Sequence, residues 1–101
     1  CKGIQLDTVS RPIVSQLIRA GTSIGANYRE ANSASSKKDF RNKIFICKKE
    51  AEETKYWLKM MKAYLDREDK ELDGLLRETQ ELILIFGKVI STLNNSKVIR
   101  N

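Results

Sequence analysis

The chain has 101 residues, a net charge of +6 and no histidine, and this length fits a single domain, residues 1–101, with one core. Hydrophobic residues make up 41% and charged residues 32%, a composition typical of a helical globular domain and not of a disordered chain. The longest apolar run, Leu82 to Phe86, has five residues, whereas a membrane-spanning helix needs roughly 20. We therefore expect no membrane association and a cytoplasmic location.

Positive charge is concentrated in the first half of the chain. Residues 1–50 contain ten Lys or Arg against four Asp or Glu, whereas residues 51–101 contain nine of each kind. Within the second half, residues 66–81 hold seven acids against three bases. We expect a molecule with a basic and an acidic region, a polarity that suits nucleic-acid binding or head-to-tail self-association.

The first predicted helix covers about residues 11–31. Pro12 is tolerated in its first turn because early helical N–H groups have no intrahelical acceptor. Apolar and small residues recur in alternating steps of three and four from Val14 to Ala31. This spacing predicts one stripe that faces a partner helix.

Two further helices follow after short polar linkers. The second is predicted over about residues 37–65, where Ser36 and Asp39 resemble a capping box. The third is predicted over about residues 70–94, with Asp69 as its N-cap and the polar residues 94–96 as its end. Both carry apolar residues in the same alternation of three and four.

Three long helices with short connections predict an all-α, antiparallel up-and-down bundle. The third helix has a broad apolar face, and the chain opens at Cys1 without a Met, so we expect a four-helix bundle whose first helix is largely missing from this chain. Several apolar residues fall outside the predicted seams: Phe45, Ile46, Met60, Leu84 and Ile85. We interpret them as an oligomer surface, with cover by the missing helix as the alternative.

The residue types needed for catalysis or metal binding are scarce. Without histidine, the Glu-x-x-His pairs of diiron bundles are excluded, and two cysteines cannot form the usual zinc sites. Cys47 falls on an apolar stripe, where core packing is favoured over redox chemistry. We expect no catalytic residue, no metal and no cofactor.

Small residues cluster in the middle of the first helix. Gly21, Ser23 and Gly25 lower helix propensity but let a neighbouring backbone approach, so close packing is their expected role. A phosphate-binding loop at residues 21–25 is the alternative, which the absence of a preceding strand weakens.

Two polar residues, Asn27 and Glu30, follow near the same seam. Buried polar groups need partners, and the second helix offers three: Arg41, Lys43 and Lys49. We expect a buried ion network that fixes the register of the two helices, with a catalytic carboxylate as the remote alternative.

A basic row marks one flank of the second helix, where Arg41, Lys48, Lys55 and Lys62 recur every seven residues. The row extends over about 30 Å and matches the repeated phosphates of a nucleic acid. A solvated lysine-rich face, which Glu52 interrupts, is the alternative interpretation. The predicted nucleic-acid contacts are Arg29, Lys37, Lys38, Arg41, Lys43, Lys48 and Lys55.

One stretch of the first predicted helix carries a long and specific motif. Residues 16–31 read QLIRAGTSIGANYREA and closely resemble the bacterial four-helix-bundle proteins called 23S rRNA intervening sequence proteins. The resemblance continues through SKKDF at 36–40, KI at 43–44, KEAEET at 49–54 and YWL at 56–58.

The resemblance implies a four-helix bundle whose first helix precedes Cys1, a ring of five bundles and no enzymatic activity. The family is named after members encoded in sequences inserted within large-subunit ribosomal RNA genes, although many relatives are encoded elsewhere. A related branch comprises accessory proteins of diversity-generating retroelements, basic pentamers that bind nucleic acid and a reverse transcriptase. Two hypotheses follow: a ring that binds RNA or DNA through a basic helical face, or a protein-interaction scaffold without direct nucleic-acid binding.

Overall fold

The computed structural model describes residues 7–100, with side chains through residue 94. These residues form three α-helices, α1 (Ser10–Asn32), α2 (Lys37–Leu65) and α3 (Lys70–Arg100), and no strand. The predicted all-α class is therefore confirmed, and the starts of the helices agree with the sequence pattern to within one residue.

The start of α1 is fixed by Asp7. Its carboxylate accepts hydrogen bonds from the N–H groups of Val9 (3.0 Å) and Ser10 (2.8 Å), and the Ser10 hydroxyl accepts one from the Asp7 N–H. The Arg11 N–H donates to the Asp7 carbonyl at 2.9 Å, so helical hydrogen bonding begins at Asp7. Reciprocal bonding of this kind satisfies the first N–H groups of a helix.

Short polar residues also limit the other helices. The Ser36 hydroxyl accepts from the Asp39 N–H at 3.1 Å, which confirms Ser36 as the N-cap of α2. Asp66, with φ of 49°, closes α2 in the left-handed conformation. The Asp69 carboxylate accepts from the Leu72 N–H at 3.1 Å and caps α3 as predicted.

α3 extends farther than the sequence pattern predicts. The expectation that residues 94–96 end this helix is wrong, because the helix continues through Arg100. No glycine or proline occurs among residues 88–101, so nothing there removes a backbone donor or favours a left-handed turn. Asn and Ser lower helix propensity by less than about 1 kcal/mol each and do not stop a helix alone.

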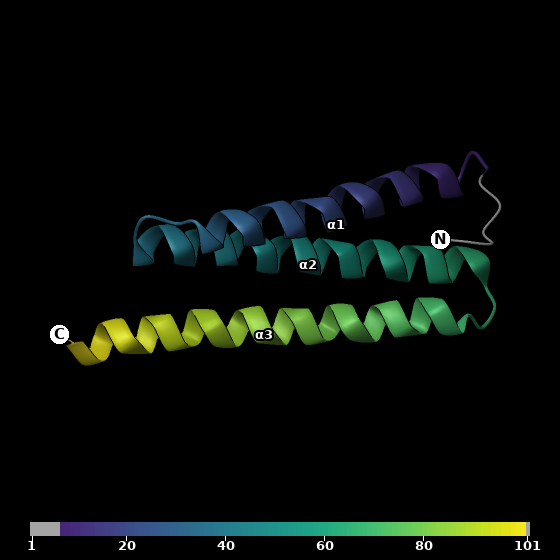
Figure 1. The fold of residues 1–101 in the computed structure, drawn as a ribbon. Helices are drawn as coiled ribbons and strands as arrows, with labels where there is room; N and C mark the ends of the chain where they lie inside the picture. The colour runs from purple at the N-terminus through teal and green to yellow at the C-terminus, as the bar shows by residue number, and fades with distance from the viewer. Residues whose placement is uncertain (1–6, 101) are drawn as a thin grey trace.

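α2 lies between the two other helices, and each turn reverses the chain so that neighbours are antiparallel (Figure 1). α1 and α3 both pack on α2, whereas no Cα atom of α1 comes within 8 Å of a Cα atom of α3. The result is an elongated molecule of 53 × 21 × 16 Å. The described residues hold three helices, so the four-helix architecture stays a prediction, and the helix expected before Cys1 falls outside them.

The core has two clusters along α2, which contributes to both. Near the α2–α3 turn the cluster consists of Ile13, Val14, Leu58, Met61 and Leu72. Nearer the α1–α2 turn it consists of Ala31, Ile44, Cys47, Ala51 and Phe86. Thr79 is also buried, and its hydroxyl donates to the Leu75 carbonyl at 2.7 Å, so that its polar group is satisfied.

Candidate nucleic-acid interface

The predicted basic row lies along the edge where α2 meets α3. Each side chain reaches the residue opposite it on α3, and the four pairs are Arg41–Asn94, Lys48–Gly87, Lys55–Gln80 and Lys62–Asp73. Three pairs are hydrogen bonds of 2.6–2.9 Å. In the fourth, the Lys48 stem lies over Gly87, where an added Cβ would sit 3.6 Å from its Cε. We call these pairs the α2–α3 ladder.

The ladder positions four cations, of which two, Lys48 and Lys62, also pair with an acid. From one pair to the next, the residue number on α2 rises by seven and the residue number on α3 falls by seven, as antiparallel helices in one register require. Only Asp73 among the α3 members is an acid. Arg41 and Lys55 bond to neutral amide oxygens, so their positive charge is positioned but not compensated.

The α1–α2 turn gathers most of the remaining predicted contacts. Arg29 lies in the last turn of α1, and Lys37 and Lys38 lie in the first turn of α2. All three are exposed, and none forms an ion pair within the described residues. Lys43 differs, because its hydrogen bond to Glu30 of α1, at 2.8 Å, raises the pKa of Lys43.

The seven predicted contacts therefore fall into two groups. Lys43 and Lys48 pair with acids, at 2.8 and 3.3 Å. The other five have no acidic partner among the described residues: Arg29, Lys37, Lys38, Arg41 and Lys55.

The two ends of the molecule carry opposite charge. Three of the five unpaired cations, Arg29, Lys37 and Lys38, lie at the α1–α2 turn, on the left in Figure 1. Residues 66–73, with five acids and two bases, form the α2–α3 turn and the start of α3 at the opposite end. This arrangement agrees with the polarity predicted from the sequence, over a long axis of 53 Å.

The predicted ion network at Asn27 and Glu30 is not buried. The Glu30 side chain is 57% exposed and that of its partner Lys43 is 28% exposed. Asn27 bonds within its own helix, where its amide donates to the Ser23 carbonyl at 2.9 Å and hydroxyl at 3.2 Å. The prediction of a buried network was wrong because Glu30 lies off the buried face of α1, whereas the next residue, Ala31, is buried in the core.

The small residues of α1 face open space in this chain. A Cβ added at Gly21 or at Gly25 would meet nothing within 4 Å. The close packing expected there has no partner among the described residues. Residues 21–25 lie inside α1, so the alternative of a phosphate-binding loop is wrong.

A polar cluster between α1 and α2 was not predicted from the sequence. Arg19 pairs with Glu50 at 3.5 Å and with Glu53, and the Trp57 indole N–H donates to Glu53 at 3.3 Å. The hydrogen bond from Arg19 lowers the pKa of Glu53, and the same bond raises the pKa of Arg19. The sequence offered one indication of this cluster, because all four residues fall within the stretches that carry the family resemblance.

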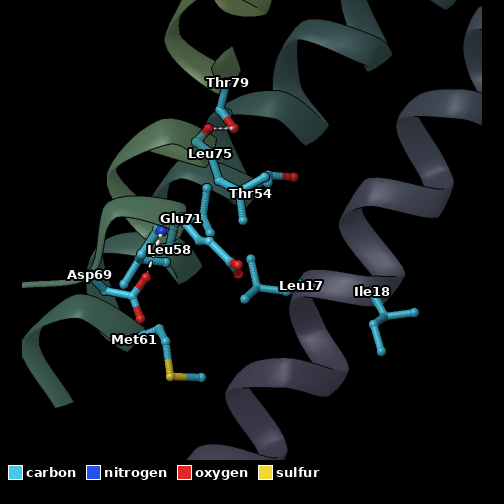
Figure 2. Close-up of a pocket in the computed structure, with 10 residues that line it drawn as sticks. Leu17, Ile18, Thr54, Leu58, Met61, Asp69, Glu71, Leu75 and Thr79 are labelled. Carbon is cyan, nitrogen blue, oxygen red and sulfur yellow. Dashed lines mark hydrogen bonds between the residues drawn. The ribbon is translucent and has the colours of Figure 1, made fainter. Parts of the chain in front are cut away.

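An apolar groove of about 220 Å³ opens between α1 and α3, with α2 as its floor. Leu17 and Ile18 line it from α1, and Leu58, Leu75 and Glu71 are among the residues on the other helices. Figure 2 shows Leu17 directed from α1 toward these side chains. Ile18 is 63% and Leu75 is 43% exposed, so large apolar side chains remain uncovered here.

Among the described residues there is no group of three or more His, Cys, Asp or Glu that could hold a metal ion. Cys47 is fully buried in the core, where burial raises the pKa of its thiol. None of the helices in this part of the chain is apolar over a length that would cross a membrane.

With this geometry in place, comparison with known proteins gives the family. The profile of the 23S rRNA-intervening sequence proteins matches residues 7–88. The chain belongs to this family. The match covers α1, α2 and most of α3, including the turn cations and all of the ladder except its Arg41–Asn94 pair, where Asn94 lies beyond it.

A solved structure supports the same assignment. A crystal structure at 1.70 Å resolution, of a protein of unknown function from the S23 ribosomal protein family of Bacteroides thetaiotaomicron, matches with a TM-score of 0.72. Sequence identity is 37%, over 77% of this chain and 72% of that chain. No curated protein matches this member of the intervening sequence family.

Proposed function

We propose that this intervening sequence protein is a non-enzymatic, cytoplasmic protein that binds RNA through the basic side of α2 and the adjoining α1–α2 turn. One observation carries the proposal: five of the seven predicted contacts have no acidic partner among the described residues. Phosphate contacts by such cations release condensed counterions, which is the main source of affinity for nucleic acids.

Titration of the protein with a structured RNA at several salt concentrations tests this function. Affinity falls steeply as salt rises, and the double change Lys37→Glu and Lys38→Glu weakens binding and lowers the salt slope by about 1 per lysine. Arg67→Glu, at the acidic end, is the matched control and has a smaller effect. Absence of binding at low salt, or equal effects of the two changes, contradicts the proposal.

The family resemblance extends the proposal to assembly. We propose a four-helix bundle in which a further helix covers the groove between α1 and α3, and a ring of five such bundles. The exposed Ile18 and Leu75 support a missing neighbour at this groove. Light scattering on the full-length protein tests the ring, and a monomeric mass contradicts it.

A protein-interaction scaffold is the second candidate, for example as an accessory subunit of a reverse transcriptase. The exposed apolar back of α3 favours it, since Leu84 is 62% and Ile85 is 54% exposed. In this case the protein does not bind RNA directly, and the double change Leu84→Ser and Ile85→Ser abolishes capture of the partner. Direct binding of RNA by the purified protein, or partner capture that survives the double change, counts against the scaffold.

A further inference from the structure

The side of α2 that faces away from the core carries an uninterrupted exposed stripe. Positions 38, 42, 45, 49, 52, 56 and 59 alternate in steps of four and three, and all seven are exposed. The stripe covers about 30 Å of helix. Its members are Lys38, Asn42, Phe45, Lys49, Glu52, Tyr56 and Lys59, and we call it the outer stripe.

Two aromatic rings interrupt the lysines of the outer stripe. Phe45 is 60% exposed and Tyr56 is 54% exposed. Tyr56 also meets Trp57 edge-on, with ring centroids 5.0 Å apart, so a neighbouring side chain supports this ring. Exposed aromatic faces beside cations are the combination with which proteins bind unpaired bases.

A shallow pocket lies beside Phe45. Its lining consists of Arg41, Asn42, Phe45, Ile90 and Asn94. The pocket therefore combines an aromatic ring with two amides and a guanidinium, and Arg41 is held there by its 2.9 Å bond to Asn94. Amides and guanidinium groups hydrogen-bond to base edges, while aromatic rings stack on base faces.

The charge of the outer stripe favours a polyanion over another protein face. Lys38, Lys49 and Lys59 have no ion pair within the described residues, and the one acid of the stripe, Glu52, pairs with Lys48 at 3.3 Å. The acids on the side of α2 that faces α1 are also ion-paired, since Arg19 pairs with Glu50 and Glu53.

We propose that the outer stripe binds a single-stranded segment of RNA, with one base in the pocket beside Phe45, another stacked on Tyr56, and the three lysines on phosphates. The proposal rests on the RNA-binding function proposed above and names the form of RNA and the site. Single strands fit because stacking on a side chain needs an unstacked base, and the deep major groove of an RNA duplex does not admit side chains.

Fluorescence titration of the full chain tests the site, with a short unstructured oligo(A) RNA and an RNA duplex of equal length as probes. The oligo(A) binds more tightly than the duplex, and Phe45→Ala and Tyr56→Ala each weaken its binding roughly tenfold. Tyr28→Ala, which removes a ring 50% exposed on α1, is the matched control and has no effect. Binding also quenches Trp57, the one tryptophan of the chain, and this quenching disappears in Tyr56→Ala.

The outcomes separate this inference from the proposed function. If neither RNA binds, both fail. If RNA binds but prefers the duplex, or if Phe45→Ala and Tyr56→Ala behave like Tyr28→Ala, the outer-stripe site is wrong while RNA binding stands. If the two variants change the mass measured by light scattering and leave RNA affinity unchanged, the outer stripe is a protein interface and the inference is overturned. Circular dichroism confirms that each variant is folded.

Discussion

Asp7 ties the start of α1 to the end of α2, across 57 residues of sequence. One carboxylate oxygen caps α1, and the other accepts the hydroxyl of Tyr64. The backbone hydrogen bond from Ser10, followed by the bond from Tyr64, lowers the pKa of Asp7 to about 2, and the bond to Asp7 raises the pKa of Tyr64. The ionised form of Asp7 is therefore the form that the fold prefers.

We predict that Asp7 makes stability depend on acid pH. Its pKa is lower in the folded chain, about 2, than its ordinary value of 3.8, so its contribution is fully present above pH 3.8 and is lost as pH falls toward 2. In the wild type, the melting temperature therefore declines as pH falls from 3.8 toward 2. Asp7→Asn removes the share of this decline that is due to Asp7, and it lowers the melting temperature at neutral pH by a few degrees. Tyr64→Phe keeps the cap and has a smaller effect. Parallel melting curves for wild type and Asp7→Asn below pH 4 contradict the prediction.

At the scale of the helices, the α2–α3 ladder links stability to charge. The amide of Gln80 positions Lys55 at 2.6 Å without neutralising it. An acid at position 80 forms an ion pair instead, and ion pairs at a protein surface contribute about 0–1 kcal/mol.

Gln80→Glu is therefore expected to have opposite effects on two properties. The melting temperature rises slightly, because the amide bond becomes a charge-assisted one. RNA affinity at low salt falls, because one cation of the basic side is neutralised. Gln80→Ala separates the two causes, since it lowers stability without adding a negative charge. A parallel rise of both stability and affinity in Gln80→Glu is incompatible with this view.

The glycines of α1 and α3 provide a test for a missing neighbour. Gly25 and Gly74 both lie in helices, and an added Cβ would meet nothing within 4 Å at either one. In the chain alone, each change to Ala raises stability by about 1 kcal/mol through helix propensity. If a further helix or a second copy packs closely on α1, Gly25→Ala weakens the assembly and Gly74→Ala does not. Equal effects of the two changes in the full-length protein exclude close packing at Gly25.

Most of the fold was predictable because each helix carries its own signals. Ser36 and Asp69 cap helices in the structure as the sequence indicates, and Cys47 is buried as its place on the stripe predicts. The end of α3 was not predictable in this way, because a short polar cluster weakens a helix without stopping it.

The candidate site was predictable only in part, because its geometry depends on two helices at once. The sequence shows Arg41 and Lys55 on one flank of α2, but their acceptors depend on the register set by the α2–α3 turn. The spacing of fourteen between Gln80 and Asn94, with Gly87 midway, was the available clue. The outer stripe was not predicted for another reason: Phe45 lies outside the apolar seam of α2, and such a residue also fits an oligomer surface.

For the whole molecule, the central position of α2 decides how the chain holds together. α2 contributes to both core clusters, whereas no Cα atom of α1 comes within 8 Å of a Cα atom of α3. Loss of α2 therefore removes the helix on which both outer helices pack.

Hydrogen exchange should follow this hierarchy. The slowest backbone amides are those near Cys47, Ala51 and Leu58, at the buried centre of α2, because their opening requires both interfaces to separate. Amides near Gly21 of α1, which borders open space, exchange faster. Mass spectrometry of peptides after timed labelling measures the order, and faster exchange at the centre of α2 than at Gly21 rules out this hierarchy.

The two amide acceptors of the α2–α3 ladder also have a consequence for protein engineering. A laboratory selection for heat resistance alone would favour Gln80→Glu and Asn94→Asp, each of which turns a neutral acceptor into an ion pair with Lys55 or Arg41. Each such variant would lose one unit of the positive charge on which the proposed RNA binding depends. The RNA affinity of heat-resistant variants should therefore be measured before they replace the wild-type protein in experiments.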